Sequence, residues 1–316
     1  MPSVRAVLRR ASDRAFGTAF DRALARTPAS GRPAFLFFWN RGMGDIALGL
    51  VPLFARIRRD RPGARIAVIT RAELEAPFGM TDADEVHVLP GLAREARVDI
   101  ARAGAELGLS VGDFDAVFDY PDPNRWLVGR RREFAPRLSW NPRWDGLGEA
   151  VLPAANGGIV VGAHVNSETG GYYGYTKDWP AERWRELMAR FPDRRDVRWA
   201  LLGQHATPGY EAAGAIDLRG RTDFPTLMSL IRNRCRVLVA PDSGILTMAY
   251  YLDAAFDLDA ISLWSDPRQG VLNQGCASPN PRLRHEPLLA PGEDLRNLPV
   301  QTVEAALRKA LQRIRG

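Results

Sequence analysis

Apolar runs alternate with amphipathic stretches along most of this chain. Residues 35–39, FLFFW, form an unbroken apolar run that is typical of a buried parallel strand. A glycine-rich turn follows at 42–45, and the apolar residues beyond it recur on one face of a helix: Ile46, Leu50, Leu53 and Ile57. This stretch predicts a strand, a tight turn and a helix, which is the opening unit of an open α/β sheet.

The same alternation of strand and helix recurs through two halves of the chain. In the first half, strands are expected at 35–39, 65–69, 85–89 and 114–118, with a helix at 92–107. In the second half, strands are expected at 158–163, 197–202, 215–218, 237–240 and 260–264, the last strand of the chain. Helices are expected from Trp179 and Pro180, and at 224–233, 244–252 and 302–314. Short connections between alternating elements predict an α/β fold with largely parallel sheets.

The chain divides by composition into four segments. Its length of 316 residues suits two domains, and the Pro-, Gly- and Ala-rich stretch 141–156 suits a linker between them. The expected segments are a basic helical extension (1–33), a first Rossmann-like domain (34–150), a second Rossmann-like domain (151–298) and a closing helical segment (299–316).

The composition is that of an ordinary globular protein, with 46% hydrophobic and 25% charged residues. Cys235 and Cys276 form neither a metal-ligand spacing nor a disulfide framework, which favours a reducing, cytoplasmic compartment. No apolar run reaches the roughly 18 residues that a membrane span needs, and the first residues lack the apolar core of a signal peptide.

The positive charge is concentrated at the start of the chain. Residues 1–33 hold seven Arg and two Asp, so the rest of the chain is almost neutral, which argues against a nucleic-acid binder. Phe16, Phe20 and Leu24 recur at helical spacing with arginines between them. Such a basic helix either lies on an anionic membrane surface, giving peripheral contact with the inner membrane, or packs on its own protein.

The glycine turn Gly42, Met43, Gly44 presents Asp45 at the carboxyl end of the first strand, where open α/β sheets bind ligands. Asp45 is therefore a candidate for chemistry, although Asp is also a favoured helix N-cap. With Ala47, the turn meets the G-x-G-x-x-A pattern of dinucleotide binding. No acidic residue ends the second strand, so a nicotinamide oxidoreductase is disfavoured.

Arginines gather after the fourth expected strand, on the side where Asp45 is expected. They are Arg125, Arg130, Arg131, Arg132 and Arg137. Guanidinium groups pair bidentately with phosphate and carboxylate, so Arg125 and Arg130, with Arg41 of the glycine turn, are candidates to bind an anionic acceptor. The alternative is a solvated charged face.

A second turn, Asp242, Ser243 and Gly244, joins a strand to a helix. Backbone N–H groups at such a junction favour a phosphate, and Ser243 adds a hydroxyl. Lys177, in a loop of the same domain, is expected to reach this region and supply a positive charge to a diphosphate. The alternatives are a cap for Asp242 and a surface position for Lys177. The histidines, His87, His164, His205 and His285, form no metal spacing, so no metal site is expected.

Five motifs carry a resemblance to a known family. They are RGMGD (41–45), TKDWPAERW (176–184), DLRGRTDF (217–224), VAPDSG (239–244) and SDP (265–267). In this order they resemble the heptosyltransferases of lipopolysaccharide core synthesis, glycosyltransferase family 9. The resemblance covers about residues 34–268, and its first and fourth motifs are the specific ones.

The resemblance implies a GT-B fold, in which two Rossmann-like domains face a central cleft. The acceptor would bind the N-terminal domain, the nucleotide-sugar donor would bind the C-terminal domain, and transfer would take place in the cleft. It also implies that the closing helix, 299–316, packs back on the first domain.

Matched by motif position, Asp45 corresponds to the family's catalytic aspartate and Lys177, with Thr176 before it, to the donor-phosphate residues. The family's nucleotide-sugar loop corresponds to Asp242, Ser243 and Gly244, and Thr222 falls where the family's backbone meets the base. The chain departs from the pattern at Thr247, where the family commonly has a histidine, and in an insertion at 170–175. Thr247 can donate a hydrogen bond but cannot carry charge.

The resemblance implies an inverting, metal-independent transferase that moves a heptose or related sugar from an ADP-sugar to a saccharide or glycolipid acceptor in surface-glycan synthesis. No cofactor other than the donor substrate is expected. Because Thr247 stands where the family commonly has a histidine, a second interpretation stays open, in which the chain is a non-catalytic partner protein that binds a nucleotide sugar. A different nucleotide sugar, and a protein or natural-product acceptor, remain alternatives.

Overall fold

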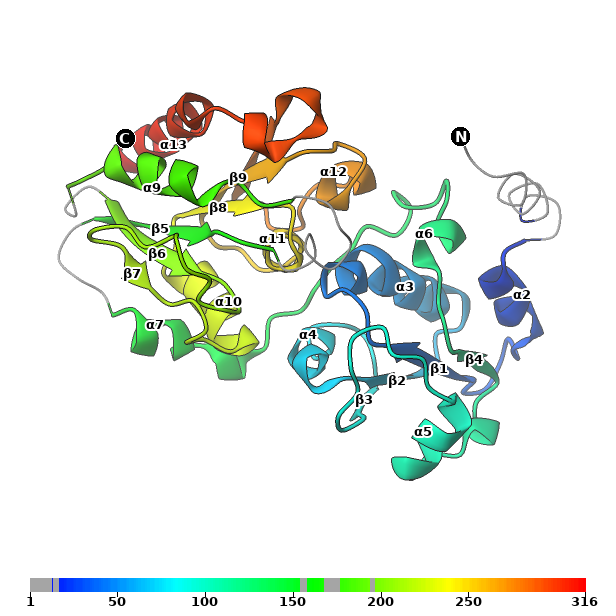
Figure 1. Ribbon diagram of the computed structural model, residues 1–316. Helices are drawn as coiled ribbons and strands as arrows, with labels where there is room; N and C mark the ends of the chain where they lie inside the picture. Colours follow the sequence, from blue (N-terminus) through cyan, green and yellow to red (C-terminus); the bar gives the residue numbers. More distant parts are fainter. Residues whose placement is uncertain (1–12, 14–16, 154–157, 168–176, 194–196) are drawn as a thin grey trace. The chain divides into compact units, whose positions relative to one another are not determined.

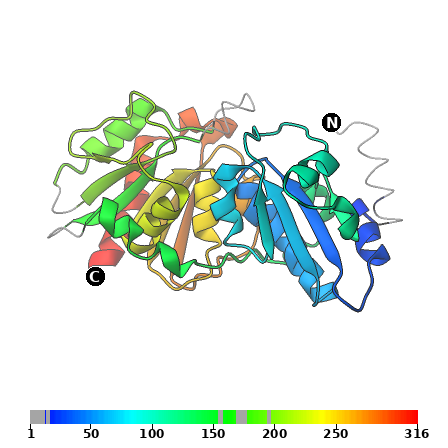
Figure 2. The same cartoon turned by 90° about the horizontal axis from the view of Figure 1, so that it is seen from below.

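A computed structural model describes residue 13 and residues 17–153, 158–167, 177–193 and 197–316. The chain divides into two compact units, unit 1 (Met1–Pro136) and unit 2 (Arg137–Gly316). Each unit is built on its own parallel sheet with helices packed around it (Figures 1 and 2). This confirms the predicted α/β class.

Unit 1 holds a sheet in the order β3-β2-β1-β4, in which every pairing is parallel. The strands are β1 (Ala34–Trp39), β2 (Arg65–Thr70), β3 (Glu85–Val88) and β4 (Ala116–Phe118). All six residues of β1 are buried, and Phe37 pairs with Val68 on one side and Phe118 on the other. The four strands predicted in the first half of the chain are confirmed.

The helix after β1 begins as a π-helix. The helical elements of unit 1 are α2 (Ala19–Arg26), η1 (Ile46–Leu50), α3 (Val51–Asp60), η2 (Ala72–Leu74), α4 (Glu75–Phe78), α5 (Ile100–Glu106), η3 (Val111–Asp113) and α6 (Pro123–Trp126). Of these, η1 is the π-helix, and α3 continues it. The predicted apolar face is buried along both: Ile46, Leu50, Leu53 and Ile57.

The helix expected at 92–107 is wrong in its first half, because α5 begins only at Ile100. Asp99 caps it by accepting hydrogen bonds from the backbone N–H groups of Ala101 and Arg102. Upstream, Glu95 has a φ of 59°, a left-handed conformation that a continuous helix cannot contain. The preceding residues therefore form a loop.

The N-terminal extension packs on unit 1 through α2. Phe20 and Leu24 are buried, and the Phe20 ring lies 5.5 Å from that of Phe118 and 5.7 Å from that of Trp126. A membrane-facing role is therefore wrong for Phe20 and Leu24, whose apolar surface is already covered. Phe16 lies outside the described residues.

Unit 2 holds a sheet in the order β10-β9-β8-β5-β6-β7, again entirely parallel. The strands are β5 (Ile159–His164), β6 (Val197–Leu202), β7 (Ile216–Asp217), β8 (Val237–Pro241), β9 (Leu258–Trp264) and β10 (Leu283–Leu289). Five strands were predicted, whereas β10 was not. It is a partly exposed edge strand containing Pro287 and charged residues, so it lacks the apolar run that marks the inner strands.

The expected linker at 141–156 is wrong where the structure describes it, because these residues fold onto unit 2. The helical elements of unit 2 are η4 (Pro142–Trp144), α7 (Leu147–Val151), α9 (Ala181–Ala189), α10 (Phe224–Asn233), α11 (Gly244–Tyr250), α12 (Gly270–Gln274), η5 (Pro291–Glu293), η6 (Leu295–Asn297) and α13 (Val300–Arg315). Helix α7 packs on α10, where the Gly148 N–H donates to Ser229 Oγ at 3.0 Å. The division between units follows Pro136 rather than residue 150.

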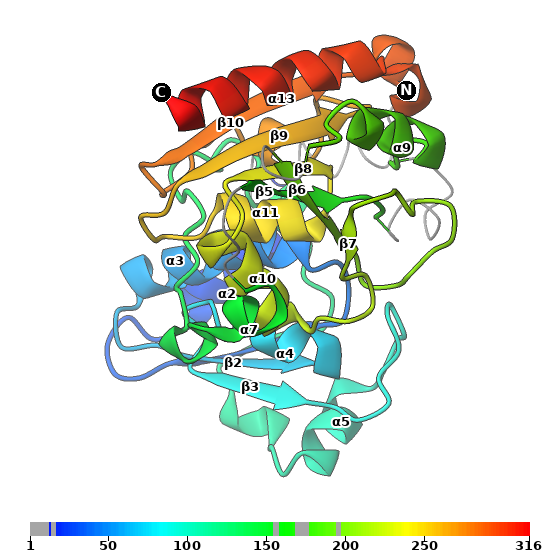
Figure 3. The same ribbon diagram turned by 90° about the vertical axis from the view of Figure 1, so that its left-hand side faces the viewer.

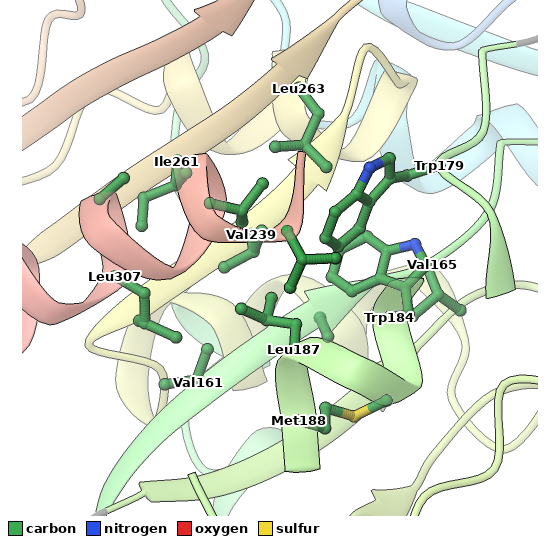
Figure 4. Close-up of a cluster of buried hydrophobic side chains, with 14 of the residues drawn as sticks. Val161, Val165, Trp179, Trp184, Leu187, Met188, Val239, Ile261, Leu263 and Leu307 are labelled. Carbon is green, nitrogen blue, oxygen red and sulfur yellow. The ribbon is translucent and has the colours of Figure 1, made fainter. Parts of the chain in front are cut away.

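The closing helix α13 belongs to the core of unit 2. It runs along β9 and β10 (Figure 3), and its Leu307 lies in one buried cluster with Leu187 of α9 and Ile261 of β9 (Figure 4). The expectation that 299–316 packs on the first domain is therefore wrong. An amphipathic pattern predicts that a face is buried, but not which apolar surface covers it.

Candidate functional site

Asp45 lies in a turn at the carboxyl end of β1. Residues 41–45 are all partly exposed, and Met43 also packs its apolar part against the core of unit 1. Within the described part of the chain, the Asp45 carboxylate makes no capping hydrogen bond to η1, so the cap interpretation is wrong. A Cβ atom at Gly42 would lie 2.9 Å from Asp45 Oδ2, so a larger residue at this position would displace the Asp45 carboxylate.

The π-helix directly after Asp45 is wedged against α6. A Cβ atom at Gly49 of η1 would lie 2.6 Å from Pro123 Cβ and Cγ. Single turns of π-helix are rare and frequently occur at functional sites. The helix that follows Asp45 is therefore supported by close packing of the Pro123 ring against the Gly49 backbone.

The arginines expected to bind an acceptor have different environments. Arg41 donates a hydrogen bond to the Pro121 carbonyl, which joins the loops after β1 and β4. Arg125 instead forms a bidentate ion pair with Asp13 and lowers the pKa of that carboxyl. Arg125 is therefore occupied by its own chain, contrary to expectation, whereas Arg130 is exposed.

The other arginines do not form one cluster. Arg131 and Arg132 stay in unit 1, where Arg131 lies 3.4 Å from Asn124 Oδ1. Arg137 lies in unit 2 and pairs with Asp253 at 2.7 Å. The predicted basic cluster after β4 is therefore smaller than its sequence suggests.

In unit 2, Lys177 forms an ion pair with Asp242, as expected from its predicted reach. The two side chains are only 12% and 11% exposed. Asp242 does not cap α11, because the cap is Ser243, whose Oγ accepts a hydrogen bond from the Leu246 N–H at 3.2 Å. Gly244 is the first residue of α11. The pair holds an ammonium group at the carboxyl end of β8.

The loop after β9 joins this site. A Cβ atom at Gly270 would lie 2.5 Å from Asp242 Oδ1 and 2.6 Å from the Trp264 ring. Asp266 of the SDP motif has a lowered pKa, mainly because Arg268 hydrogen-bonds to it and also because of the Lys177 charge. The motifs that follow β5, β8 and β9 therefore meet at one edge of the sheet.

The threonines expected to contact the donor, Thr176, Thr222 and Thr247, differ in what the structure shows of them. Thr247 is buried and donates its hydroxyl hydrogen bond to the Ser243 carbonyl at 3.0 Å, and its contact with the donor stays a prediction. Thr222 precedes α10, and its buried Oγ1 has no hydrogen-bond partner among the described residues. Thr176 and the insertion at 170–175 lie outside the described residues.

Two buried titratable residues of unit 2, Asp178 and His164, were not predicted as site residues. Burial raises the pKa of Asp178 to about 6, although the Ser167 N–H donates to its Oδ1 at 2.5 Å. Burial lowers the pKa of His164, the last residue of β5, to about 4. Asp178 directly follows Lys177 in its motif, and this adjacency was the available signal.

Two other kinds of feature are missing from the part of the chain that the structure describes. Among them, no group of three His, Cys, Asp or Glu side chains is placed to hold a metal ion. No helix in the described ranges has both the length and the apolar character to cross a membrane.

No family model and no curated protein matches the sequence. Solved structures resemble the fold. A family 9 glycosyl transferase from Veillonella parvula superposes with a TM-score of 0.60 at 13% identity, covering 91% of this chain and 99% of that one. The ADP-heptose lipopolysaccharide heptosyltransferase II of E. coli gives 0.57 at 18% identity, with 90% and 100% covered.

The E. coli heptosyltransferase WaaC, solved with ADP, gives a TM-score of 0.54 at 18% identity and covers 88% of this chain and 99% of that one. These likenesses extend over both units. The chain therefore has the α/β fold of family 9 glycosyltransferases and ADP-heptose heptosyltransferases, as its motifs predicted.

Proposed function

We propose that the protein is an inverting glycosyltransferase that moves a heptose or related sugar from an ADP-sugar to a saccharide hydroxyl. The observation that carries the proposal is the Lys177–Asp242 ion pair, which places an ammonium at the edge of the unit 2 sheet. The solved structures with this fold support it, since one was determined with ADP and another is an ADP-heptose heptosyltransferase.

Asp45 is the proposed general base. Its carboxylate accepts the proton of the acceptor hydroxyl while the acceptor oxygen bonds to the anomeric carbon of the donor. The bond from that carbon to the diphosphate oxygen breaks, and ADP leaves with the electron pair. A single displacement of this kind inverts the configuration at the anomeric carbon, and base catalysis contributes typically ~10² to 10⁴ in rate.

Lys177 is the proposed electrostatic group for the departing diphosphate. Its ammonium has three N–H donors, of which Asp242 accepts one, so the pair positions the lysine. The backbone amides of Ser243 and Gly244 would add hydrogen bonds to the same phosphates. With this charge in place the leaving group is stabilised by protein groups, and we propose that the reaction needs no metal.

The proposed acceptor is an anionic saccharide or glycolipid of a bacterial surface glycan, such as lipopolysaccharide, reached from the cytoplasm. Peripheral contact with the inner membrane stays part of this proposal. It would not use Phe20 and Leu24, which are buried in unit 1. Nucleic acid is not a proposed partner.

A non-catalytic nucleotide-sugar-binding protein is the second candidate. The observation that favours it is Thr247, which is buried and hydrogen-bonded within α11 where the related family commonly has a histidine. Slow hydrolysis of an ADP-sugar that depends on both Asp45 and Lys177 would separate the enzyme from such a binding protein.

Calorimetric titration with ADP, UDP, GDP and NADH, first without metal and then with Mg²⁺, tests the donor. We expect ADP to bind without metal, and Lys177→Ala to weaken it by at least about tenfold because a charge-assisted contact is lost. The matched control is Lys309→Ala, whose side chain is 62% exposed and paired with Glu286.

Each of the remaining outcomes would contradict one part of the proposed function. Preferred binding of UDP or GDP would remove the ADP-sugar donor but keep a transferase. Binding of NADH alone would favour an oxidoreductase, and equal weakening by Lys309→Ala would remove the role of the Lys177–Asp242 pair. If no nucleotide binds, the proposed donor site is wrong.

A further inference from the structure

Three loops converge at the carboxyl edge of the unit 1 sheet. Asn40, the residue after β1, is buried and donates hydrogen bonds to the carbonyls of Ala93 at 3.1 Å and Ala96 at 2.8 Å. The Glu95 N–H donates back to the Asn40 carbonyl at 3.2 Å, which holds Glu95 in its left-handed conformation. The loop after β3 is thereby tied to the turn that carries Asp45.

Tyr120, in the loop after β4, is the point where these loops meet. Its side chain is 46% exposed, one of the more exposed large hydrophobic residues of the described chain. The Arg41 guanidinium lies 4.6 Å from the ring centroid, and the Arg97 guanidinium lies 4.3 Å from it. Arg41 also lies 4.0 Å from the Trp39 ring, so aromatic contacts hold its guanidinium plane.

Among the residues that the structure describes, no carboxylate forms an ion pair with Arg41 or Arg97. Arg125, nearby in sequence to Tyr120, shows the contrasting case of a guanidinium held by a carboxylate of the same chain. Two positive charges therefore lie at one exposed ring, beside the turn of the proposed base.

A cation–π contact does not use the N–H groups of a guanidinium as hydrogen-bond donors to a carbonyl or carboxylate, so these groups can still donate to an oxyanion. One amino group of Arg41 donates a hydrogen bond to the Pro121 carbonyl, and this bond further fixes the orientation of the guanidinium. A preorganised pair of guanidiniums binds an anion with less loss of side-chain entropy than flexible surface arginines do.

We propose that Arg41, Arg97 and Tyr120 form the site that binds the oxyanion, carboxylate or phosphate, of the acceptor saccharide. This inference rests on the proposed function and deepens it. Arg97 replaces Arg125 as an acceptor-binding residue, because Arg125 is paired with Asp13. The site requires an acceptor with a negative charge close to the hydroxyl that receives the sugar.

The test is titration of the full-length protein with glucuronate, glucose 6-phosphate and glucose at low salt. We expect at least one anionic sugar to bind at least tenfold more tightly than glucose, and its Kd to rise at least tenfold in Arg97→Gln and in Arg41→Gln. Arg102→Gln is the matched control, since Arg102 is an 82% exposed arginine a few residues along the same segment. Whichever anionic sugar binds identifies the oxyanion as carboxylate or phosphate.

Three results would overturn the proposal: unchanged binding in Arg97→Gln, loss in Arg130→Gln instead, or equal affinity for glucose and both anionic sugars. ADP titration of the same variants is read separately, because its proposed site lies in unit 2. If ADP does not bind but the anionic sugar binding depends on Arg97, the proposed function fails while the anion site stands. If ADP binds and the sugar results fail, only the anion site is wrong.

Discussion

Gly42 lies so close to Asp45 that a Cβ atom at Gly42 would be 2.9 Å from Asp45 Oδ2. Gly42→Ala therefore displaces the proposed base, and we expect transfer from an ADP-sugar to slow by up to about 100-fold. Initial rates measure this effect, with ADP affinity unchanged. Gly112→Ala is the control, since its nearest described neighbour would be Ser110 Oγ at 3.6 Å. An equal loss in the control would contradict the geometric explanation.

Asp45→Asn keeps the size of the side chain but removes its ability to accept a proton at neutral pH. We expect the rate of sugar transfer to fall by about 10² to 10⁴. ADP affinity, measured by calorimetry, is expected to stay within about twofold, because the proposed diphosphate site lies in unit 2. Full transfer activity in this variant would falsify the role of Asp45.

Gly270→Ala tests the packing around the Lys177–Asp242 pair. A Cβ atom would lie 2.5 Å from Asp242 Oδ1, so the carboxylate and its lysine must shift, and we expect ADP to bind at least about tenfold more weakly. Gly292→Ala is a matched control, because Gly292 has a similar positive φ of 68° and its nearest described neighbour would be Asn297 Nδ2 at 3.7 Å. Equal weakening in both would point to backbone strain alone.

Asp178→Asn tests the raised pKa of Asp178, which burial brings to about 6. The charged form is disfavoured in the folded protein, so this residue contributes stability below its unfolded pKa of about 4, and the contribution is lost as pH rises through about 6. We expect the asparagine variant to be more stable than the wild type by about 1 to 2 kcal/mol at pH 7.5, after allowance for solvent screening.

That difference is expected to shrink to a few tenths of a kcal/mol, about RT ln 2, near pH 4, where the folded-state carboxyl is protonated and the unfolded-state carboxyl is about half protonated. Thermal unfolding at pH 7.5 and pH 4 measures it. A variant less stable than the wild type at pH 7.5 would show that the Asp178 charge is favourable in the fold.

Leu307→Ala tests the assignment of α13 to unit 2. Leu307 is fully buried, so its truncation should cost about 2 to 5 kcal/mol of the free energy of unfolding. Hydrogen exchange should then accelerate in β9 and α9, whose residues share its cluster, and not in β1 or β2. The exposed Gln312→Ala is the control. Faster hydrogen exchange in β1 instead would show that α13 packs on unit 1.

Much of the fold could be predicted from local pattern. The apolar run of β1 and the spaced face of Ile46, Leu50, Leu53 and Ile57 specify strand and helix through their own periodicity. Lys177 and Asp242 could be brought together because the carboxyl ends of parallel strands share an edge. Strand β10 escaped prediction because an exposed edge strand needs no apolar run.

By itself, the sequence determined the order of the strands other than β10, their two parallel series and the glycine turns, because each depends on the spacing of neighbouring residues. Only the tertiary structure decided which apolar surface covers each helix and which group each charged side chain contacts. It assigned α13 to unit 2, Arg125 to Asp13, and Arg97 to Tyr120. Burial and ion pairing join residues far apart in the chain, and their choice depends on shape and charge in three dimensions.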